Sequence, residues 1–189
     1  FAYHNVSSPI HRGVFLSRSI LGRSLKPPAA AITPVPPKLH PDLTTRQRVA
    51  LQTNHLVCRS CHEMINPLGY ALENFDAAGR FRQKEKNRDI DASGSYLQQS
   101  GELAKFSGAK GLGKFLANSD EVHLAFVEQL FQHVVKQPIQ AYGSGQKEKL
   151  RDLFVSSELN VNALLAEIAT VSAFDHPPAD APSVEAAAK

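Results

Sequence analysis

Residues 58–62 read CRSCH, and this pentapeptide contains both cysteines of the chain. Residues three and four apart share one face of a helix, so the thiols of Cys58 and Cys61 can both reach one edge of a flat cofactor. The next residue, His62, is then directed toward the centre of that cofactor. A C-x-x-C-H sequence is a haem c attachment signature, and histidine is a standard axial ligand of haem iron. The motif predicts one covalent haem, with His62 on the iron.

Two other uses of a C-x-x-C pair fit the rest of the sequence less well. A thioredoxin-type dithiol is expected beside a βαβ unit, and the sequence shows no such pattern. A structural zinc site needs two further ligands at matching spacing, and the chain has no second cysteine pair. Haem c is therefore the prediction, with zinc or a disulfide as the alternatives.

The motif does not assign the second axial position on the iron. Methionine is a common ligand there, but the only methionine, Met64, lies two residues after His62 and thus on the same side of the haem. The helix expected over 120–137 has an apolar stripe, with His123 in its middle and His133 at its edge. His123 also lies in the first helical turn, where the helix dipole favours a neutral imidazole. We predict His123 as the sixth ligand before His133, with another histidine or an open position as alternatives.

Three more residues are predicted to contact the haem. Arg80 and Arg82 can form fork-shaped hydrogen bonds to its propionates, and a plain surface position is the alternative for each. Pro67 is placed among the haem-binding residues as well. Asn66–Pro67 is also expected to end the helix that begins near Cys58, because proline lacks the backbone N–H that a helix interior needs.

The hydrophobic pattern predicts a mainly α fold: a cytochrome c-like helical domain around one covalent haem, with a small β-hairpin over 79–101 and a C-terminal helical lobe. Residues 11–25 are expected to form a short helix or an extended arm. Further helices are expected over 45–55 behind a threonine cap, from about Cys58, and over 68–75, 108–118, 120–137, 145–156 and 161–172. The predicted organisation is an N-terminal arm with a proline-rich strap (1–41), a haem-attachment domain (42–118), a helical lobe packing on the haem (119–175) and a mobile tail (176–189).

Composition limits the partners and the setting. The net charge is +3, from 21 basic and 18 acidic residues, and this mixed balance argues against nucleic-acid binding. No run of 18 apolar residues predicts a membrane span. Aromatic residues make up only 7% of the chain, so a bound haem is expected to supply much of the missing apolar surface. Haem is attached to cysteines outside the cytoplasm, so the absence of a signal pattern suggests a trimmed or excised chain that works in the periplasm or outside the cell.

Longer stretches carry a family resemblance. HRGVFLSRSILGR, LTTRQRVALQT, CRSCHEMINPLGYALENFDAAGRFR, DASGSY and FVEQLFQHVVKQPIQAYG resemble the C-terminal domains of large planctomycete-type cytochrome c proteins. The resemblance runs from about Ser8 to Ala173 and implies that Cys58, Cys61 and His62 hold the haem. It also implies that the chain is a C-terminal piece of a larger, secreted, haem-bearing polypeptide of unassigned function. Many members have tyrosine where this chain has His133, so the resemblance leaves the sixth ligand open.

These observations predict a single-electron carrier that exchanges electrons with a redox partner protein or with other haem domains of a larger polypeptide. A rival prediction is a haem enzyme with an open distal site that acts on peroxide or a small oxidant, with His123, His133 or Tyr142 as acid–base groups. A third is a haem-bearing unit of a surface or multi-cytochrome assembly.

Overall fold

A computed structural model describes residues 2–3, 6–25 and 40–174. These residues are mainly helical, as predicted, and divide into two compact units, one up to Val122 and one from His123. The boundary falls inside a helix, four residues later than the 118/119 boundary expected from the sequence. The tail predicted over 176–189 and nearly all of the proline-rich strap predicted over 27–41 lie outside the described residues.

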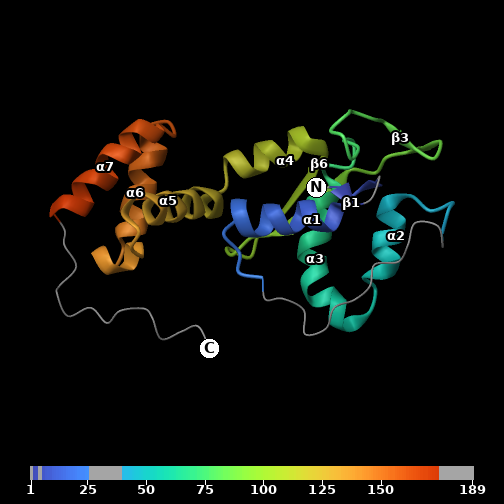
Figure 1. Cartoon of the computed structure of the whole chain (residues 1–189), viewed down its shortest axis with the longest axis horizontal. Coiled ribbons are helices and arrows are strands. Elements are labelled where there is room, and N and C mark those ends of the chain that lie inside the picture. The colour runs from blue at the N-terminus through green and yellow to red at the C-terminus, as the bar shows by residue number, and fades with distance from the viewer. Residues whose placement is uncertain (1, 4–5, 26–39, 175–189) are drawn as a thin grey trace. The chain divides into compact units, whose positions relative to one another are not determined.

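Figure 1 shows the elements of both units. The α-helices in the described ranges are α1 (Pro9–Phe15), α2 (Thr45–Gln52), α3 (Leu56–Tyr70), α4 (Gly108–Ala117), α5 (Asp120–Val135), α6 (Gln146–Ser156) and α7 (Val161–Phe174). A π-helical segment (Leu16–Ile20) follows α1, and a 3₁₀ turn (Ile139–Tyr142) precedes α6. The strands form antiparallel pairs: β1 (Ala2–Tyr3) with β2 (Val6–Ser7), β3 (Lys84–Glu85) with β4 (Arg88–Asp89), and β5 (Ser93–Leu97) with β6 (Leu103–Ser107).

The predicted hairpin is present, and a second one follows it. Lys86 and Asn87 connect β3 to β4, and both have positive φ angles, 51° and 62°. Two such residues in a two-residue loop are typical of the turn whose twist matches paired strands. The β5–β6 pair extends past the predicted limit at Gly101 to Ser107.

Helix α3 corrects one prediction, because it continues through Asn66–Pro67 instead of ending there. Proline removes one backbone hydrogen bond from a helix interior and costs about 3 kcal/mol. Burial after Pro67 offsets that cost, since the side chains of Leu68 and Ala71 are completely buried. Tertiary packing thus overrides the local helix-breaking signal.

The N-terminal segment packs against α3 as a helix. An added Cβ at Gly13 of α1 would lie 2.0 Å from the Ile65 carbonyl oxygen, and one at Gly69 of α3 would lie 1.9 Å from that of Pro9. The two backbones therefore approach each other closely at two glycines. Residues 9–20 belong to the body of the first unit.

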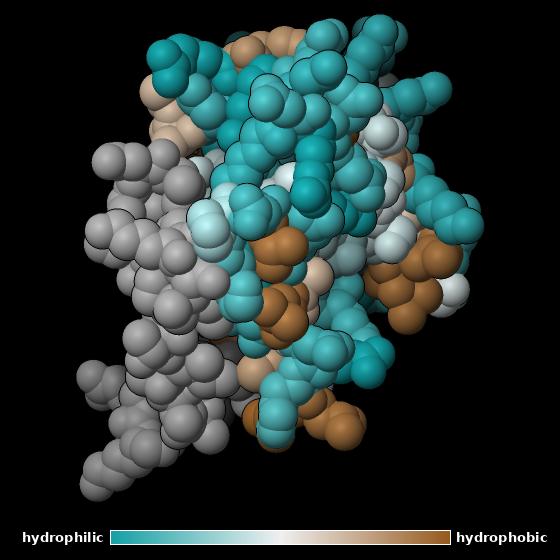
Figure 2. Space-filling model, turned by 90° about the vertical axis from the view of Figure 1, so that its right-hand side faces the viewer, coloured by the Kyte–Doolittle hydropathy of each residue, from teal (hydrophilic) through white to brown (hydrophobic). Residues whose placement is uncertain are grey.

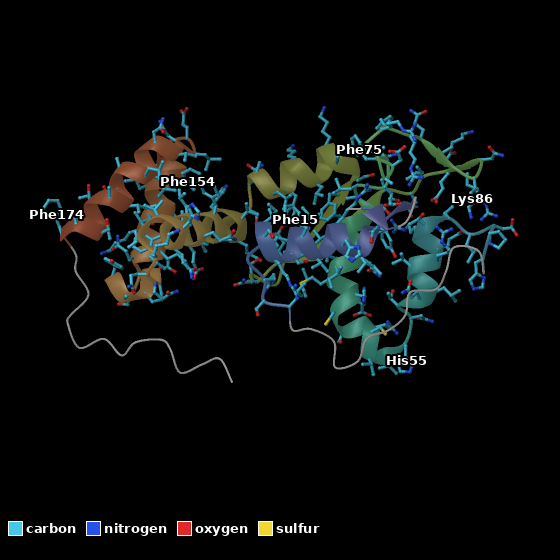
Figure 3. All side chains as sticks on the ribbon, in the orientation of Figure 1. Phe15, His55, Phe75, Lys86, Phe154 and Phe174 are labelled. Carbon is cyan, nitrogen blue, oxygen red and sulfur yellow. The ribbon has the colours of Figure 1, made fainter. Side chains whose placement is uncertain are left out.

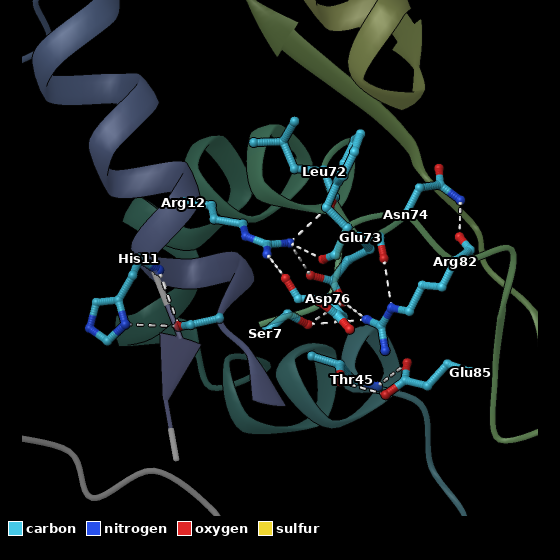
Figure 4. Close-up of polar contacts among 12 residues, drawn as sticks. Ser7, His11, Arg12, Thr45, Leu72, Glu73, Asn74, Asp76, Arg82 and Glu85 are labelled. Atoms are coloured by element: carbon cyan, nitrogen blue, oxygen red, sulfur yellow. Dashed lines mark hydrogen bonds and ion pairs between the residues drawn. The ribbon is translucent and has the colours of Figure 1, made fainter. Parts of the chain in front are cut away.

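Arg12 ties α1 to the chain that follows α3 (Figure 4). Its buried guanidinium donates hydrogen bonds to the carbonyl oxygens of Leu72 and Phe75, both at 2.8 Å, and of Asp76 at 2.9 Å. Two of these carbonyls also accept backbone N–H groups, that of Leu72 from Phe75 at 3.0 Å and that of Asp76 from Gly79 at 3.1 Å. Arg12 thereby connects α1 to turns that are already hydrogen-bonded.

The same guanidinium pairs with Glu73, the most deeply buried acidic side chain described. Glu73 lies 3.3 Å from Arg12 and 3.2 Å from Arg82, and it accepts a hydrogen bond from the Ser7 hydroxyl at 2.9 Å. Burial raises the pKa of Glu73 in spite of these favourable contacts, and burial likewise lowers the pKa of Arg12. Both directions indicate that removing the two charges from water outweighs their attraction.

The second unit packs its helices around an apolar core. Buried side chains from α5, α6 and α7, with Ile139 of the 3₁₀ turn, form one cluster: Val127, Phe131, Ile139, Leu150, Phe154, Leu164, Ile168 and Val171. The predicted helix over 120–137 is confirmed as α5, two residues shorter at its C-terminal end.

Candidate functional site

The CRSCH segment occupies the first turns of α3. His55 caps this helix, because its ring nitrogen Nδ1 accepts a hydrogen bond from the Val57 N–H at 3.4 Å. Figure 3 shows His55 at that end of α3. The helix therefore starts two residues before the predicted position, and Cys58, Cys61 and His62 are all helical. Cys58 is half-buried, Cys61 is exposed, and both are free thiols.

His62 is held by a series of hydrogen bonds that extends through buried side chains of the first unit. Its Nδ1 lies 2.9 Å from Oδ1 of Asn66, one turn further along α3. The Asn66 amide Nδ2 donates to Oγ1 of Thr53 at 2.9 Å, and the Thr53 hydroxyl donates to the Val49 carbonyl at 2.8 Å. Asn66 and Thr53 are only 6% and 7% exposed, so the partners of His62 are fixed by packing.

An open pocket of about 270 Å³ lies beside this chain of contacts. Its lining comes from α2, α3 and the turn between them: Ala50, Thr53, Asn54, Arg59, His62, Glu63, Asn66, Pro67 and Tyr70. The structure thus brings Pro67 and His62 to one surface, and the contact of Pro67 with a haem stays a prediction. Asn66 and Thr53 were not predicted to lie here. Asn66 could have been recognised from its position four residues after His62, whereas Thr53 precedes His62 on another helix.

Tyr70 forms one wall of this pocket. The Arg46 guanidinium lies over the Tyr70 ring, 4.3 Å from its centre. Burial raises the pKa of Tyr70 to about 12, although the charge of Arg46 and a hydrogen bond from the Asn66 side chain act in the opposite direction. Tyr70 is therefore a neutral phenol at physiological pH.

Apolar side chains are exposed around the start of α3. Leu56 is 83% exposed and Val57 74%, directly before Cys58, and Leu51 near the end of α2 is 52% exposed. In the space-filling view, hydrophobic side chains interrupt a largely hydrophilic surface (Figure 2). Exposed apolar side chains that form one patch are typical of a surface that another group covers.

Arg80 and Arg82 do not line the pocket. The Arg80 guanidinium is 2.8 Å from the Asp76 carboxylate at an exposed position. Arg82 donates to Ser7 at 3.2 Å and to Glu73 at 3.2 Å within the buried network. The contact of either arginine with haem propionates stays a prediction.

His123, His133 and Tyr142 belong to the second unit. His123 is buried, as its place in the apolar stripe predicted, with its ring edge-on to Phe154 at 6.3 Å. His133 is exposed at the end of α5. Tyr142 packs edge-on against Phe131 at 5.1 Å. The sixth-ligand assignment stays a prediction.

Two further properties of the described ranges concern metal ions and membranes. No group of three or more His, Cys, Asp or Glu side chains is arranged there to hold a metal ion. None of the helices in these ranges has the length and apolar character that a membrane crossing needs.

Comparison with known proteins gives one match. Residues 1–85 match the model of a family described as PSCyt3, a protein of unknown function (DUF1588). The matched part contains α1, α2, α3 and the whole CRSCH motif. No curated protein and no solved structure matches the chain.

Proposed function

We propose that this chain is a c-type cytochrome: it would carry one haem on Cys58 and Cys61, with His62 as a ligand of its iron, and would transfer single electrons. The observation that carries the proposal is the CRSCH sequence on the first turns of a helix, with the His62 ring already oriented by Asn66. The name of the matching family, PSCyt3, agrees with an association with cytochromes.

The donor set fits a covalently attached haem. Cys58 and Cys61 are free thiols one helical turn apart, and neither is fully buried, so both can react. Each thiol would add across one vinyl group, with its sulfur on one carbon and its hydrogen on the other. No atom leaves and no oxidant is needed. When bound, a haem c supplies an iron that alternates between the ferrous and ferric states.

The residues around the motif have separate tasks in this proposal. His62 provides a nitrogen ligand, and its hydrogen bond to Asn66 prevents the ring from turning. Leu56 and Val57 provide apolar surface beside Cys58 that would exclude water from the attached ring. Pro67 lines the pocket next to His62 and leaves no backbone N–H there to be satisfied.

The setting is part of the proposal. Covalent attachment keeps a cofactor bound in an environment where it would otherwise be lost, and it is carried out outside the cytoplasm. We therefore place the chain in the periplasm or outside the cell. Its partner would be a redox protein or further haem domains of a larger polypeptide.

Production of the full chain in a host with periplasmic haem-attachment machinery tests this function. The denatured protein is expected to retain the full mass of one haem and to give a pyridine haemochrome spectrum of the two-thioether type. Cys58→Ser with Cys61→Ser should abolish both signals. His62→Ala should retain the covalent mass but alter the spectrum of the folded protein, because only the iron ligand is removed.

Ser60→Ala is the matched control, since Ser60 lies between the two cysteines, is exposed and does not line the pocket. It should take up haem like the parent chain. Free thiols or bound zinc in the parent chain, with no haem, would contradict the proposal. Rapid binding of carbon monoxide to a high-spin iron would instead favour the haem enzyme.

A further inference from the structure

We propose that Asn66 and Thr53 are positioning residues that hold His62 in the Nδ1–H tautomer and so leave Nε2 as its only free base. The tautomer itself does not depend on the proposed function. Only its consequence, that Nε2 is the nitrogen offered to a haem iron, rests on that function.

The direction of each hydrogen bond follows from the far end of the chain of contacts. The Val49 carbonyl can only accept, so the single hydroxyl proton of Thr53 is donated to it. The Thr53 oxygen must then accept from Asn66, and only the Asn66 amide nitrogen can donate. The amide oxygen consequently faces His62.

The Asn66 amide oxygen opposite Nδ1 decides which nitrogen of the His62 ring carries the proton. The Asn66 oxygen has no proton, so Nδ1 of His62 must carry one to make the 2.9 Å contact a hydrogen bond. In a neutral imidazole the proton is then absent from Nε2. The opposite tautomer would place two acceptors face to face at a buried amide.

Reversal of the amide does not rescue the other tautomer. A flipped Asn66 would direct its oxygen at Thr53, and the Thr53 hydroxyl would have to give up the Val49 carbonyl to donate to it. Thr53 therefore holds the amide in one orientation.

The chemical consequence concerns the basicity of the ligand. A histidine that donates one ring N–H to a fixed acceptor binds metal through the other nitrogen, and the strength of the acceptor tunes that nitrogen. Here the acceptor is a side chain, so substitution can change its strength without altering the backbone.

The first experiment uses the full chain without haem, as the Cys58→Ser, Cys61→Ser variant with ¹⁵N-labelled histidine. The nitrogen resonances of His62, assigned by their loss in His62→Gln, report which ring nitrogen carries the proton. We expect a protonated Nδ1 in roughly tenfold excess, and loss of that excess in Asn66→Leu. Thr53→Ser, which keeps the hydroxyl, should preserve the excess, whereas Thr53→Val should reduce it. A predominantly protonated Nε2 in the parent background would overturn the proposal.

The second experiment measures the midpoint potential of the haem-bearing chain. Asn66→Asp offers Nδ1–H a stronger acceptor and should lower the potential, whereas Asn66→Leu removes the acceptor and should raise it. A merely structural role would move both variants in the same direction, so shifts of equal sign, or no shift, would overturn the proposal. If the chain takes up no haem at all, the proposed function fails while the tautomer measurement still decides this inference.

Discussion

The unit that ends at Val122 buries charged groups, whereas the unit that begins at His123 buries mostly hydrocarbon. In the first unit, Arg12 and Glu73 connect α1 to the chain after α3, and Asn66 and Thr53 connect α3 to α2. Among the described residues of the second unit, the buried polar side chains are those of His123 and Gln146. Directional bonds can hold a particular side chain in one orientation, and a uniform apolar core cannot. The CRSCH motif lies in the unit that has such bonds.

Truncation of the apolar core should have the largest effect on stability. Phe131 is completely buried and contacts the ring of Tyr142. Phe131→Ala is expected to lower the free energy of unfolding by about 3–5 kcal/mol, since it removes a large side chain and leaves a cavity. Urea unfolding followed by circular dichroism measures this. Gln132→Ala, at the next and exposed position of α5, is the control and should change stability by about 0.5 kcal/mol or less. Equal effects of the two variants would mean that this unit lacks a fixed core.

Removal of one partner from the buried charged network should come next. Glu73→Ala leaves Arg12 buried without its carboxylate, and we expect a loss of about 3 kcal/mol in the free energy of unfolding. The matched control is Glu63→Ala, which breaks an exposed pair with Arg59 at 2.9 Å and should cost about 0.5 kcal/mol. Urea unfolding measures both. If Glu73→Ala were as mild as Glu63→Ala, the network would not distinguish the first unit from the second.

Some of these elements could be predicted from local patterns in the sequence. The threonine cap before α2 is confirmed. The Thr44 side chain accepts a hydrogen bond from the Gln47 N–H, and the Gln47 side chain accepts one from the Thr44 N–H. This cap could be predicted because its two residues lie only three positions apart. The ends of helices α4 to α7 lie within two residues of the ends predicted from the apolar spacing. Local patterns were sufficient for these elements.

The rest depends on pairs of residues that are distant in the chain. The close approach of Gly13 to Ile65 and the burial of Glu73 by Arg12 follow from how the elements pack, and no local pattern contains them. The continuation of α3 through Pro67 has the same origin. Within the candidate site, Cys58, Cys61 and His62 were predicted from their spacing. Thr53 lies 13 residues before Asn66, so only the fold brings the two side chains together.

Alkaline pH should lower the stability of the first unit through the ionisation of Tyr70. The pKa of this phenol is raised to about 12 in the folded chain, against about 10 when unfolded. A raised pKa means that the folded state holds the proton more tightly, so the stability it contributes is present below pH 10 and is lost as the pH rises toward 12. A difference of two pKa units corresponds to at most about 2.7 kcal/mol, of which roughly half is lost by pH 11. Tyr70→Phe should be less stable than the parent at pH 7, because its hydroxyl bonds are gone, and should lose less stability above pH 10.

Urea unfolding at pH 7 and at pH 11 measures this difference. Part of the alkaline loss should persist in Tyr70→Phe, because burial raises the pKa of Tyr96 to about 12 as well. An identical pH dependence in the parent and in Tyr70→Phe would show that Tyr70 ionises normally and that the wall of the pocket is open to water.

The smallest effect is expected at the motif itself. Cys58, Cys61 and His62 belong neither to the apolar cluster of the second unit nor to that of the first, and Cys61 is exposed. The cluster of the first unit consists of Leu16, Leu21, Leu68, Ala71, Tyr96, Phe106 and Leu112. The low aromatic content predicts that a bound haem adds apolar surface to the core, and this stays a prediction. Cys58→Ser with Cys61→Ser should therefore change the stability of the haem-free chain by about 0.5 kcal/mol or less. Thermal unfolding of the haem-free parent and of this variant tests it. Loss of cooperative unfolding in the variant would mean that the cysteines support the fold. Matching transitions would mean that the fold does not depend on the two cysteines.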